Sequence, residues 1–310
     1  MMMYPATNCF GPCQQTPIVE NTALVAEGGG QRGIFTAGVL DSWMSLGFNP
    51  FQLLIGTSAG AQNLSSYMSC QHGFAQKSIT ETSRHARFFK LSRSLTGRSI
   101  IDLDWYFEQV NRPADPLNVN SAASLLRYRR LLFATTNTRN KAAHYFSPSR
   151  DNWLHLLKAS SALPYLYKGG VEIEGEHYVD GGLAAPIPVE EAYRRGAKTI
   201  VVIRTKQQDY VAESPWSQRL KTWVCQSGEC PKALDYQLIH EQAYQQSLDF
   251  MHQPPEDAQV FQIHPSQALS SKLLGSKTSA LEQDYQLGLE AGFRFVEQFE
   301  QTTPLGTPLA

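Results

Sequence analysis

The chain has 310 residues, of which 42% are hydrophobic and 18% are charged, and its formal net charge is −1. This composition is typical of a folded globular protein and excludes a largely disordered chain. Because the chain carries no strong excess of basic residues, we expect no nucleic-acid partner.

The five cysteines are too few and too scattered for a disulfide framework. Cys9/Cys13 and Cys225/Cys230 are spaced too widely for a CxxC motif, and no paired histidines at zinc-site spacing accompany them. Residues 1–20 lack a basic region followed by an apolar stretch, so we expect no signal peptide. No apolar run approaches about 18 residues, so we expect no membrane span. The expected location is the cytoplasm, with at most a peripheral contact with a membrane.

The hydrophobic pattern predicts strands that alternate with helices after a flexible lead-in of residues 1–20. In chain order, we predict a strand at Leu24–Ala26, a helix at Ile34–Leu46, a strand at Leu53–Ile55, a helix at Ala61–Ser69, a strand at Arg130–Thr135, a short helix at Trp153–Ala159 and a strand at Lys198–Ile203. Beyond Arg204 we predict two amphipathic helices, Asp235–Met251 and Glu282–Phe299, with a strand at Gln259–His264 between them. Two successive strand–turn–helix units imply a parallel sheet with crossover helices.

The turn after the second predicted strand, Gly56–Gly60, has the sequence GTSAG and matches GxSxG. A strand-to-helix elbow of this kind holds a nucleophilic serine, here Ser58, in a crowded backbone conformation that the flanking Gly56 and Gly60 relieve. Its place between a strand pattern and a helix pattern favours a nucleophile over a chance pentapeptide.

The turn after the first predicted strand, Gly28–Gly33, is rich in glycine and contains GxGxxG. A dinucleotide-binding loop has an acidic residue about 20 positions further on. Here no Asp or Glu occurs between Asp41 and Glu81, so we exclude that interpretation. Glycine amides at a helix N-terminus bind an oxyanion or a phosphate. Arg32 either orients this loop or meets an anionic head group, and a surface ion pair is the alternative.

A serine nucleophile needs a base, and none of the eight histidines lies in a motif typical of a catalytic triad. Asp209 with His240 or His264 satisfies the chain order of an α/β-hydrolase triad formally. The better candidate is Asp180, which ends a predicted hairpin around Glu174-Gly175 and precedes Gly181 and Gly182. A buried carboxylate with a raised pKa can accept the serine proton directly. An ordinary Asp-Gly turn is the alternative.

The stretch Ser78–Asn111 is unusually apolar for a region with so many turn residues. It is either a helical insertion that packs on the sheet or a cap that lines the substrate site. We consider its aromatic part, Phe88–Phe107, a candidate interfacial surface for transient contact with a membrane or micelle, and a buried insertion is the alternative. The basic residues of the stretch Ser78–Asn111 are Arg84, Arg87, Lys90, Arg93 and Arg98.

Four blocks in this order resemble the patatin-like phospholipases, in particular their bacterial branch: EGGGQRG, GTSAG, ASSALP and DGG, at Glu27–Gly33, Gly56–Gly60, Ala159–Pro164 and Asp180–Gly182. The resemblance implies a three-layer α/β/α fold with a central, mainly parallel sheet. It also implies a Ser–Asp dyad, with Ser58 as nucleophile and Asp180 as the proton acceptor. The oxyanion hole that it implies consists of the backbone amides of Gly28, Gly29 and Gly30.

The residues predict a serine hydrolase, and the resemblance implies a lipid acyl hydrolase that works through an acyl-serine intermediate and needs no cofactor. Arg32, Gly33, Gly56, Gly60, Gly181 and Gly182 support the motifs. We expect a lead-in at residues 1–20, a catalytic core at 21–205 and a helical extension at 206–310 that packs on the same domain. A transacylase or thioesterase with the same dyad is one alternative, and a lipid-binding regulator with little turnover is another. Many family members have Asp where this chain has Glu27, and we expect little effect from that difference.

Overall fold

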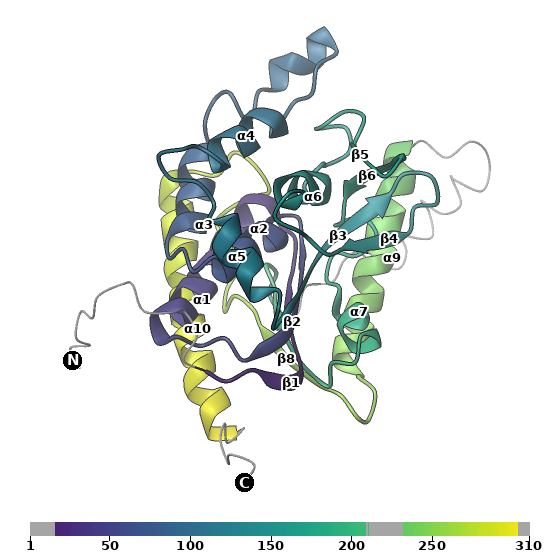
Figure 1. The fold of residues 1–310 in the computed structure, drawn as a ribbon. Coiled ribbons are helices and arrows are strands. Elements are labelled where there is room, and N and C mark those ends of the chain that lie inside the picture. Colours follow the sequence, from purple (N-terminus) through teal and green to yellow (C-terminus); the bar gives the residue numbers. More distant parts are fainter. Residues whose placement is uncertain (1–15, 209, 211–231, 303–310) are drawn as a thin grey trace.

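The computed structural model describes residues 16–208, 210 and 232–302 (Figure 1). In these ranges one sheet of eight strands has the order β5-β6-β3-β2-β1-β7-β8, with β4 paired to β3 beside this path. In chain order the strands are β1 (Val19–Ala26), β2 (Phe51–Thr57), β3 (Arg130–Asn137), β4 (Ala143–Phe146), β5 (Val171–Ile173), β6 (Glu176–Asp180), β7 (Thr199–Ile203) and β8 (Gln259–Ile263).

The centre of the sheet is parallel, because β3, β2, β1, β7 and β8 pair in that order with the same direction. The pairs that β3 makes with β4 and β6, and the pair of β5 with β6, are antiparallel. Strands covered on both faces are continuously apolar, as Leu24–Ala26 and Ile200–Ile203 are. The fold is therefore a mainly parallel α/β/α arrangement, and the predicted fold class is confirmed.

The helices fill both faces of this sheet. The α-helices are α1 (Gly33–Leu46), α2 (Ala59–Met68), α3 (Phe74–Lys77), α4 (Leu103–Val110), α5 (Val119–Leu125), α6 (Trp153–Ser160), α7 (Val189–Arg194), α9 (Lys232–His252) and α10 (Thr278–Thr302). Three short segments are helical in other ways: η1 (Gly30–Arg32) and η3 (Leu91–Thr96) are 3-10 turns, and η2 (Ser78–Thr82) is a π-helical turn. None of the helices in the described ranges is long and apolar enough to cross a membrane.

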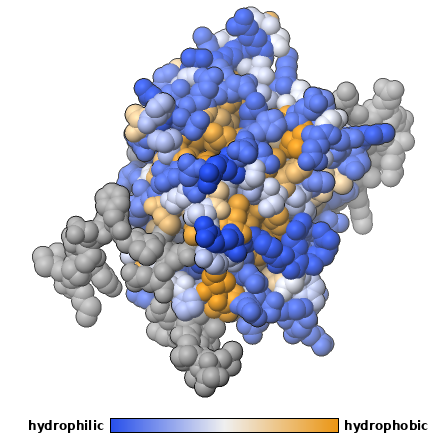
Figure 2. Space-filling view, viewed as in Figure 1, coloured by the Kyte–Doolittle hydropathy of each residue, from blue (hydrophilic) through white to orange (hydrophobic). Residues whose placement is uncertain are grey.

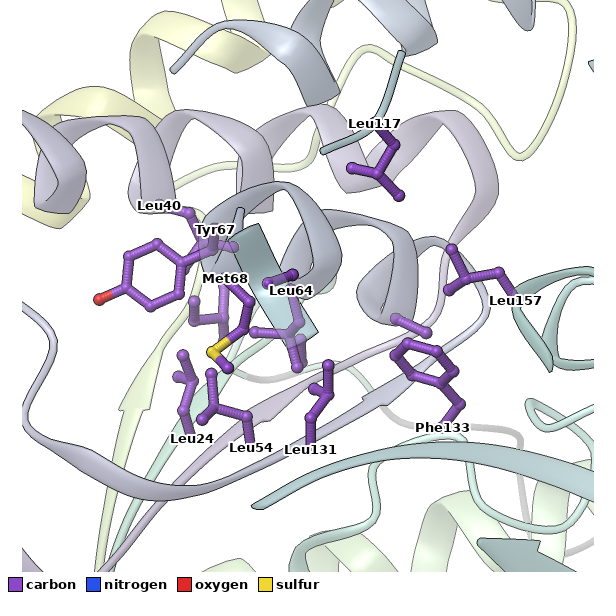
Figure 3. Packing of buried hydrophobic residues seen from close by; sticks show 14 of the residues in the cluster. Leu24, Leu40, Leu54, Leu64, Tyr67, Met68, Leu117, Leu131, Phe133 and Leu157 are labelled. Carbon is purple, nitrogen blue, oxygen red and sulfur yellow. The ribbon is translucent and has the colours of Figure 1, made fainter. Parts of the chain in front are cut away.

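Alternate residues of the strands supply two separate hydrophobic layers. On one face Leu24, Leu54 and Leu131 pack under Leu64 and Met68 of α2, as Figure 3 shows. Side chains of α1, α4, α6 and α10 belong to the same layer. This is the largest buried cluster in the described part of the chain, and it supports the helix that follows Ser58.

On the other face the layer is closed by α7 and α9. Val25, Ile55 and Val202 point to this side and pack with Tyr244 and Leu248 of α9. Figure 1 shows α7 and α9 together on the side of the sheet opposite α1, α2 and α10. The C-terminal part of the chain thus contributes to both outer layers, and β8 adds an edge strand to the sheet.

The predicted elements that fall in the described ranges are present with boundaries shifted by a few residues. The antiparallel β5 and β6 form the expected hairpin, and Glu174 and Gly175 at its turn both have positive φ, 53° and 82°. The lead-in was predicted to reach residue 20, but β1 already begins at Val19. Strand β4, which lies at the side of the sheet, and the short helix α7 were not predicted.

Candidate active site

Ser58 occupies the turn between β2 and α2, at the carboxyl end of the parallel strands. Its backbone has φ 53° and ψ −119°, which is costly for a residue with a side chain and typical of functional turns. Gly60 is required here because a Cβ at that position would overlap the Ala26 carbonyl oxygen of β1. A Cβ at Gly56 would lie 2.6 Å from the Ala61 backbone nitrogen. The two glycines of GxSxG therefore let the elbow sit tightly against neighbouring backbone.

Asp180 ends β6 and faces this elbow. The Ser58 hydroxyl donates to Asp180 Oδ2 at 2.6 Å, and the Gly182 amide donates to Asp180 Oδ1 at 2.7 Å. Both side chains lie inside the protein, since Ser58 is 8% exposed and Asp180 is 2% exposed. The structure thus brings together the two residues singled out as nucleophile and base.

Burial governs the protonation of this carboxyl group. Loss of hydration raises the pKa of Asp180 to about 6, although the hydrogen bonds from Ser58 and Gly182 oppose the rise. A carboxylate with such a pKa is ionised near neutral pH, and it binds a proton more readily than a solvent-exposed aspartate does. The pair is therefore suited to take a proton from the serine hydroxyl and return it.

The two glycines after Asp180 have different surroundings. A Cβ at Gly181 would overlap the Ala134 carbonyl oxygen of β3, so the turn lies directly on that strand. A Cβ at Gly182 would lie 2.9 Å from Asp180 Oδ1. Gly181 thus allows close packing of backbone, whereas Gly182 keeps space for the carboxylate itself.

The glycine loop connects β1 to η1 beside the serine. The Gly28 amide donates to the Pro186 carbonyl oxygen at 3.3 Å. The amides of Gly29 and Gly30 have no hydrogen-bond acceptor in the described part of the chain. At Gly29, an added Cβ would lie 2.8 Å from Thr205 Oγ1. At Gly30, an added Cβ would overlap the Leu273 carbonyl oxygen, and the backbone there also has φ +57°.

The last residues of this motif pack near the elbow. Gly33 begins α1 and accepts a hydrogen bond from Asn63 Nδ2 at 2.9 Å, which ties α1 to α2. Arg32 lines a cavity that also contains Ser58 and Asp180. Its Nε is buried and has no hydrogen-bond partner within the described ranges.

Ser160, which belongs to the ASSALP block, contacts the elbow directly. Its hydroxyl accepts from the Ser58 amide at 2.9 Å and donates to the Ala134 carbonyl oxygen at 2.6 Å. It thereby links the strained turn to β3, on which the Asp180 turn also lies. The only sequence signal for this role was the ASSALP block itself.

The two histidines of the triad alternative, His240 and His264, make hydrogen bonds with backbone carbonyl oxygens and not with Ser58. His240 of α9 makes a 2.6 Å hydrogen bond from Nδ1 to the Gly182 carbonyl oxygen. His264 Nδ1 is 3.3 Å from the carbonyl oxygen of its neighbour Pro265. Asp209 lies outside the described residues. The group that accepts from the Ser58 hydroxyl is a carboxylate.

Two cavities meet at Ser58. The narrower one, of about 80 Å³, runs between α2 and the 74–117 segment, and its walls are mainly apolar. The wider one, of about 430 Å³, contains Asp180 and the glycine loop together with side chains of α9. Ser58 therefore has a mainly apolar space on one side and a space with both polar and apolar walls on the other.

The segment Ser78–Asn111 supplies much of the apolar wall, so it lines the site in addition to packing on the fold. Phe88, Tyr106 and Phe107 are each at most 6% exposed, so for these rings the structure agrees with the buried insertion and not with the candidate interfacial surface. They are buried because they complete the larger hydrophobic cluster. The large hydrophobic residues of this segment that are exposed are Leu91 and Leu95 in η3.

Comparison with known proteins agrees with the motifs. Residues 24–193 match the family model described as patatin-like phospholipase, and residues 230–303 match a model described as a domain of unknown function, DUF6363. The uncharacterized protein YjjU of Escherichia coli strain K12 is 42% identical over 275 residues, which cover 88% of this chain and 76% of that protein.

Solved structures with low sequence identity are similar over most of this chain. VipD from Legionella pneumophila aligns with a TM-score of 0.41 and 12% identity, covering 90% of this chain and 67% of that one. Human GIVD cytosolic phospholipase A2, in complex with methyl gamma-linolenyl fluorophosphonate inhibitor and terbium chloride, aligns with a TM-score of 0.46 and 13% identity. That alignment covers 94% of this chain and 59% of the human chain, which is less than two thirds of its length.

The patatin model spans more than half of the chain, and the likeness to YjjU extends over most of both proteins. The family predicted from the four sequence blocks is confirmed. The chain belongs to the patatin-like phospholipase family.

Proposed function

We propose that this protein is a lipid acyl hydrolase that cleaves carboxylic esters through an acyl-Ser58 intermediate. The observation that carries the proposal is the 2.6 Å hydrogen bond from the Ser58 hydroxyl to a buried carboxylate, within a chain of this family. A hydroxyl group is a weak nucleophile unless an adjacent base accepts its proton. Asp180, with its pKa raised to about 6, is suited to be that base.

In the first half of the reaction, Ser58 Oγ attacks the ester carbonyl carbon while its proton moves to Asp180 Oδ2. The tetrahedral intermediate then collapses, the bond to the alcohol oxygen breaks, and Asp180 returns the proton to the leaving alkoxide. In the second half, Asp180 removes a proton from water, the resulting hydroxide attacks the acyl carbon, and Ser58 leaves with that proton. The fatty acid is released and the dyad returns to its starting state.

The oxyanion formed in both halves needs hydrogen-bond donors. We propose the amides of Gly29 and Gly30 as the principal donors, because both lack an acceptor within the described residues. The Gly28 amide, the third member of the predicted oxyanion hole, donates to the Pro186 carbonyl oxygen at 3.3 Å. It can donate to the oxyanion only when that hydrogen bond is broken.

The two cavities suggest how a lipid ester is oriented. The acyl chain enters the narrower, apolar cavity, where Leu157 and Val110 are among the lining residues. The alcohol part lies in the wider cavity, where Arg32 and Lys206 supply positive charge. Burial and the nearby Arg32 lower the pKa of Lys206. An anionic group on the alcohol side would relieve the repulsion between these two cations.

Lipid esters reside in bilayers or micelles, so the proposed activity requires contact with a lipid surface. Segment η3 stands out from the molecule above α4 in Figure 1, and it exposes Leu91 (64%) and Leu95 (87%). In the same view Figure 2 shows patches of hydrophobic residues below this projection among hydrophilic ones. An antiparallel bridge between Phe89 and Ile101 joins the two sides of the chain at the base of this projection, and Phe88 and Ile101 line the narrower cavity. We propose that η3 contacts the lipid surface near the entrance for the acyl chain.

The test of the proposed function is hydrolysis of p-nitrophenyl esters and of a phospholipid by the wild type and by Ser58→Ala. We expect the variant to lose activity by at least about 10³-fold, because the nucleophile is absent. If Ser58→Ala hydrolyses both substrates at the wild-type rate, the proposed function is wrong.

A further inference from the structure

We propose that α9 holds the two catalytic loops in place, with His240 as the positioning residue for the Asp180 turn and Tyr244 as the positioning residue for the glycine loop. Helix α9 lies in residues 230–303, the region that matches a domain of unknown function. The proposal rests on the proposed function of Ser58 and Asp180. It assigns a role in that site to a region outside the patatin match.

The first contact of α9 is with the turn that follows Asp180. A carbonyl oxygen only accepts hydrogen bonds, so the 2.6 Å contact between His240 Nδ1 and the Gly182 carbonyl oxygen places a proton on Nδ1. The amide of the same Gly182 donates to Asp180 Oδ1 at 2.7 Å. His240 therefore fixes the residue that orients the proposed base.

The second contact is with the start of the glycine loop. Tyr244 donates its hydroxyl to Glu27 Oε1 at 2.9 Å, and Glu27 Oε2 accepts from the Thr205 amide. Glu27 and Tyr244 are each 2% exposed, and burial raises the pKa of Tyr244, so the phenol remains a donor. Glu27 directly precedes Gly28. The Glu27 carboxylate thus connects the start of the glycine loop to α9 and to Thr205, two residues after the end of β7. The expectation that glutamate instead of aspartate has little effect here stays a prediction.

His240 and Tyr244 are four residues apart and so lie on one face of the helix. Ser247 continues this face and donates to the Ile187 carbonyl oxygen at 2.9 Å, in the segment after the Asp180 turn. One regular helix thus makes hydrogen bonds with both loops, and it fixes the distance between them. A misplacement of about 1 Å at a catalytic centre can lower the rate about 10²-fold. Because the rate is this sensitive to position, the hydrogen bonds of His240 and Tyr244 are suited to hold the two loops at a fixed distance.

The first part of the test measures positioning without relying on activity. Hydrogen–deuterium exchange is compared in the wild type, His240→Ala, Tyr244→Phe and the control Gln246→Ala, whose side chain is exposed on the same helix. We expect His240→Ala to speed exchange in the peptide that contains Gly181–Ile187, and Tyr244→Phe to do so in the peptide that contains Glu27–Gly33. Unchanged exchange in both peptides would overturn the proposal, even if the protein has no ester hydrolase activity.

The second part measures the consequence for catalysis. For His240→Ala we expect kcat to fall about 10- to 100-fold, with KM within about threefold and the low-pH limb of the rate profile shifted upward. The variant His240→Gln keeps a donor and should recover most of the loss. Tyr244→Phe should lower kcat about tenfold without shifting that limb, because Glu27 contacts the glycine loop and not Asp180.

Three results contradict this catalytic role while leaving the proposed function intact. One is a Ser58-dependent activity that is the same in all α9 variants. Another is a rise in KM with unchanged kcat and pH profile, which would assign His240 to substrate binding. A third is a loss of rate that matches the fraction of unfolded protein, measured by circular dichroism at the assay temperature.

Discussion

The Ser58 hydroxyl donates to the Asp180 carboxylate at 2.6 Å, although 122 residues separate them in the chain. Strand β3 lies between β2 and β6 and brings them together. Its Ala134 carbonyl oxygen accepts from Ser160, whose hydroxyl in turn holds the Ser58 amide. Gly181 packs against the same carbonyl group. One backbone position of β3 is thus the common support of the proposed nucleophile and base.

Replacement of Asp180 by asparagine should remove the base and keep the fold. We expect kcat to fall by about 10²- to 10⁴-fold, because the amide cannot accept the Ser58 proton. Steady-state hydrolysis of a p-nitrophenyl ester measures this. Asp151→Asn, at an exposed position, is the matched control and should leave the rate unchanged. An Asp180→Asn variant with wild-type kcat would contradict the assignment of the base.

The same substitution has a predicted effect on stability. The folded protein holds the Asp180 proton more tightly than the unfolded chain does, since the pKa rises from 3.8 to about 6. This contribution to stability is therefore complete below pH 3.8 and is lost as the pH rises through about 6. Asp180→Asn avoids that loss, so its Tm at pH 8 should equal or exceed that of the wild type. A clearly lower Tm at pH 8 would show that the ionised carboxylate stabilises the fold.

Catalysis should depend on pH in the opposite direction. Because Asp180 must be ionised to accept a proton, kcat/KM should rise with pH and level off above about 6. The measurement is a rate profile from pH 4.5 to 8.5 with a substrate that does not ionise in this range. A profile that is flat across pH 6 would be inconsistent with Asp180 as the base.

The two glycines of the Asp180 turn should respond differently to alanine. Gly181→Ala introduces a Cβ against the Ala134 carbonyl oxygen, and we expect overpacking to cost about 1–3 kcal/mol of stability. Gly182→Ala places a Cβ 2.9 Å from Asp180 Oδ1, so it should lower kcat with a smaller effect on stability. Chemical denaturation and ester hydrolysis of both variants distinguish the two effects. Equal losses in both assays for both variants would refute this division.

The apolar cavity should determine how well long acyl chains are accepted. Val110→Phe adds volume to the wall of that cavity, and we expect the ratio of kcat/KM for a long-chain ester to that for the acetate to fall at least about tenfold. This ratio is independent of the fraction of folded enzyme. Val260→Phe, at a half-buried valine of β8 that lines neither cavity, is the control. If both variants keep the wild-type ratio, the acyl chain lies elsewhere.

The exposed leucines of η3 should contribute to binding of lipid vesicles. We expect Leu91→Ser and Leu95→Ser to weaken sedimentation with phosphatidylglycerol vesicles about tenfold each, because each leucine loses its burial in the lipid. Leu46→Ser is the control, since Leu46 is 38% exposed at the end of α1, far from η3 in the sequence. Equal binding by all of these variants would rule out η3 as the contact surface.

Much of the fold could be predicted because it depends on local patterns. The apolar run at Leu53–Ile55 followed by GTSAG predicted the turn at Ser58, and the alternation around Glu174-Gly175 predicted the β5–β6 hairpin. The choice of Asp180 over a histidine relied on the motif and on the absence of a placed histidine. The structure shows the side chains of Ser58 and Asp180 in contact.

Other features depend on contacts between distant residues, which leave no local pattern. Nothing near Ser160 in the sequence shows that its hydroxyl holds the Ser58 amide. The hydrogen bond between Tyr244 and Glu27 forms only when α9 packs on the sheet. The two alternatives for Phe88 could not be separated from the sequence for a similar reason, because an aromatic residue beside arginines has the same local pattern whether it is buried or exposed.

The central claim is that Ser58 forms a covalent bond with the acyl group. The direct measurement is reaction of the wild-type protein with an alkyl fluorophosphonate, followed by mass mapping of its peptides. We predict one adduct per chain, on the peptide that contains Ser58, and none on the Ser58→Ala variant. An adduct on another residue in the wild type, or equal labelling of the Ser58→Ala variant, would contradict the account.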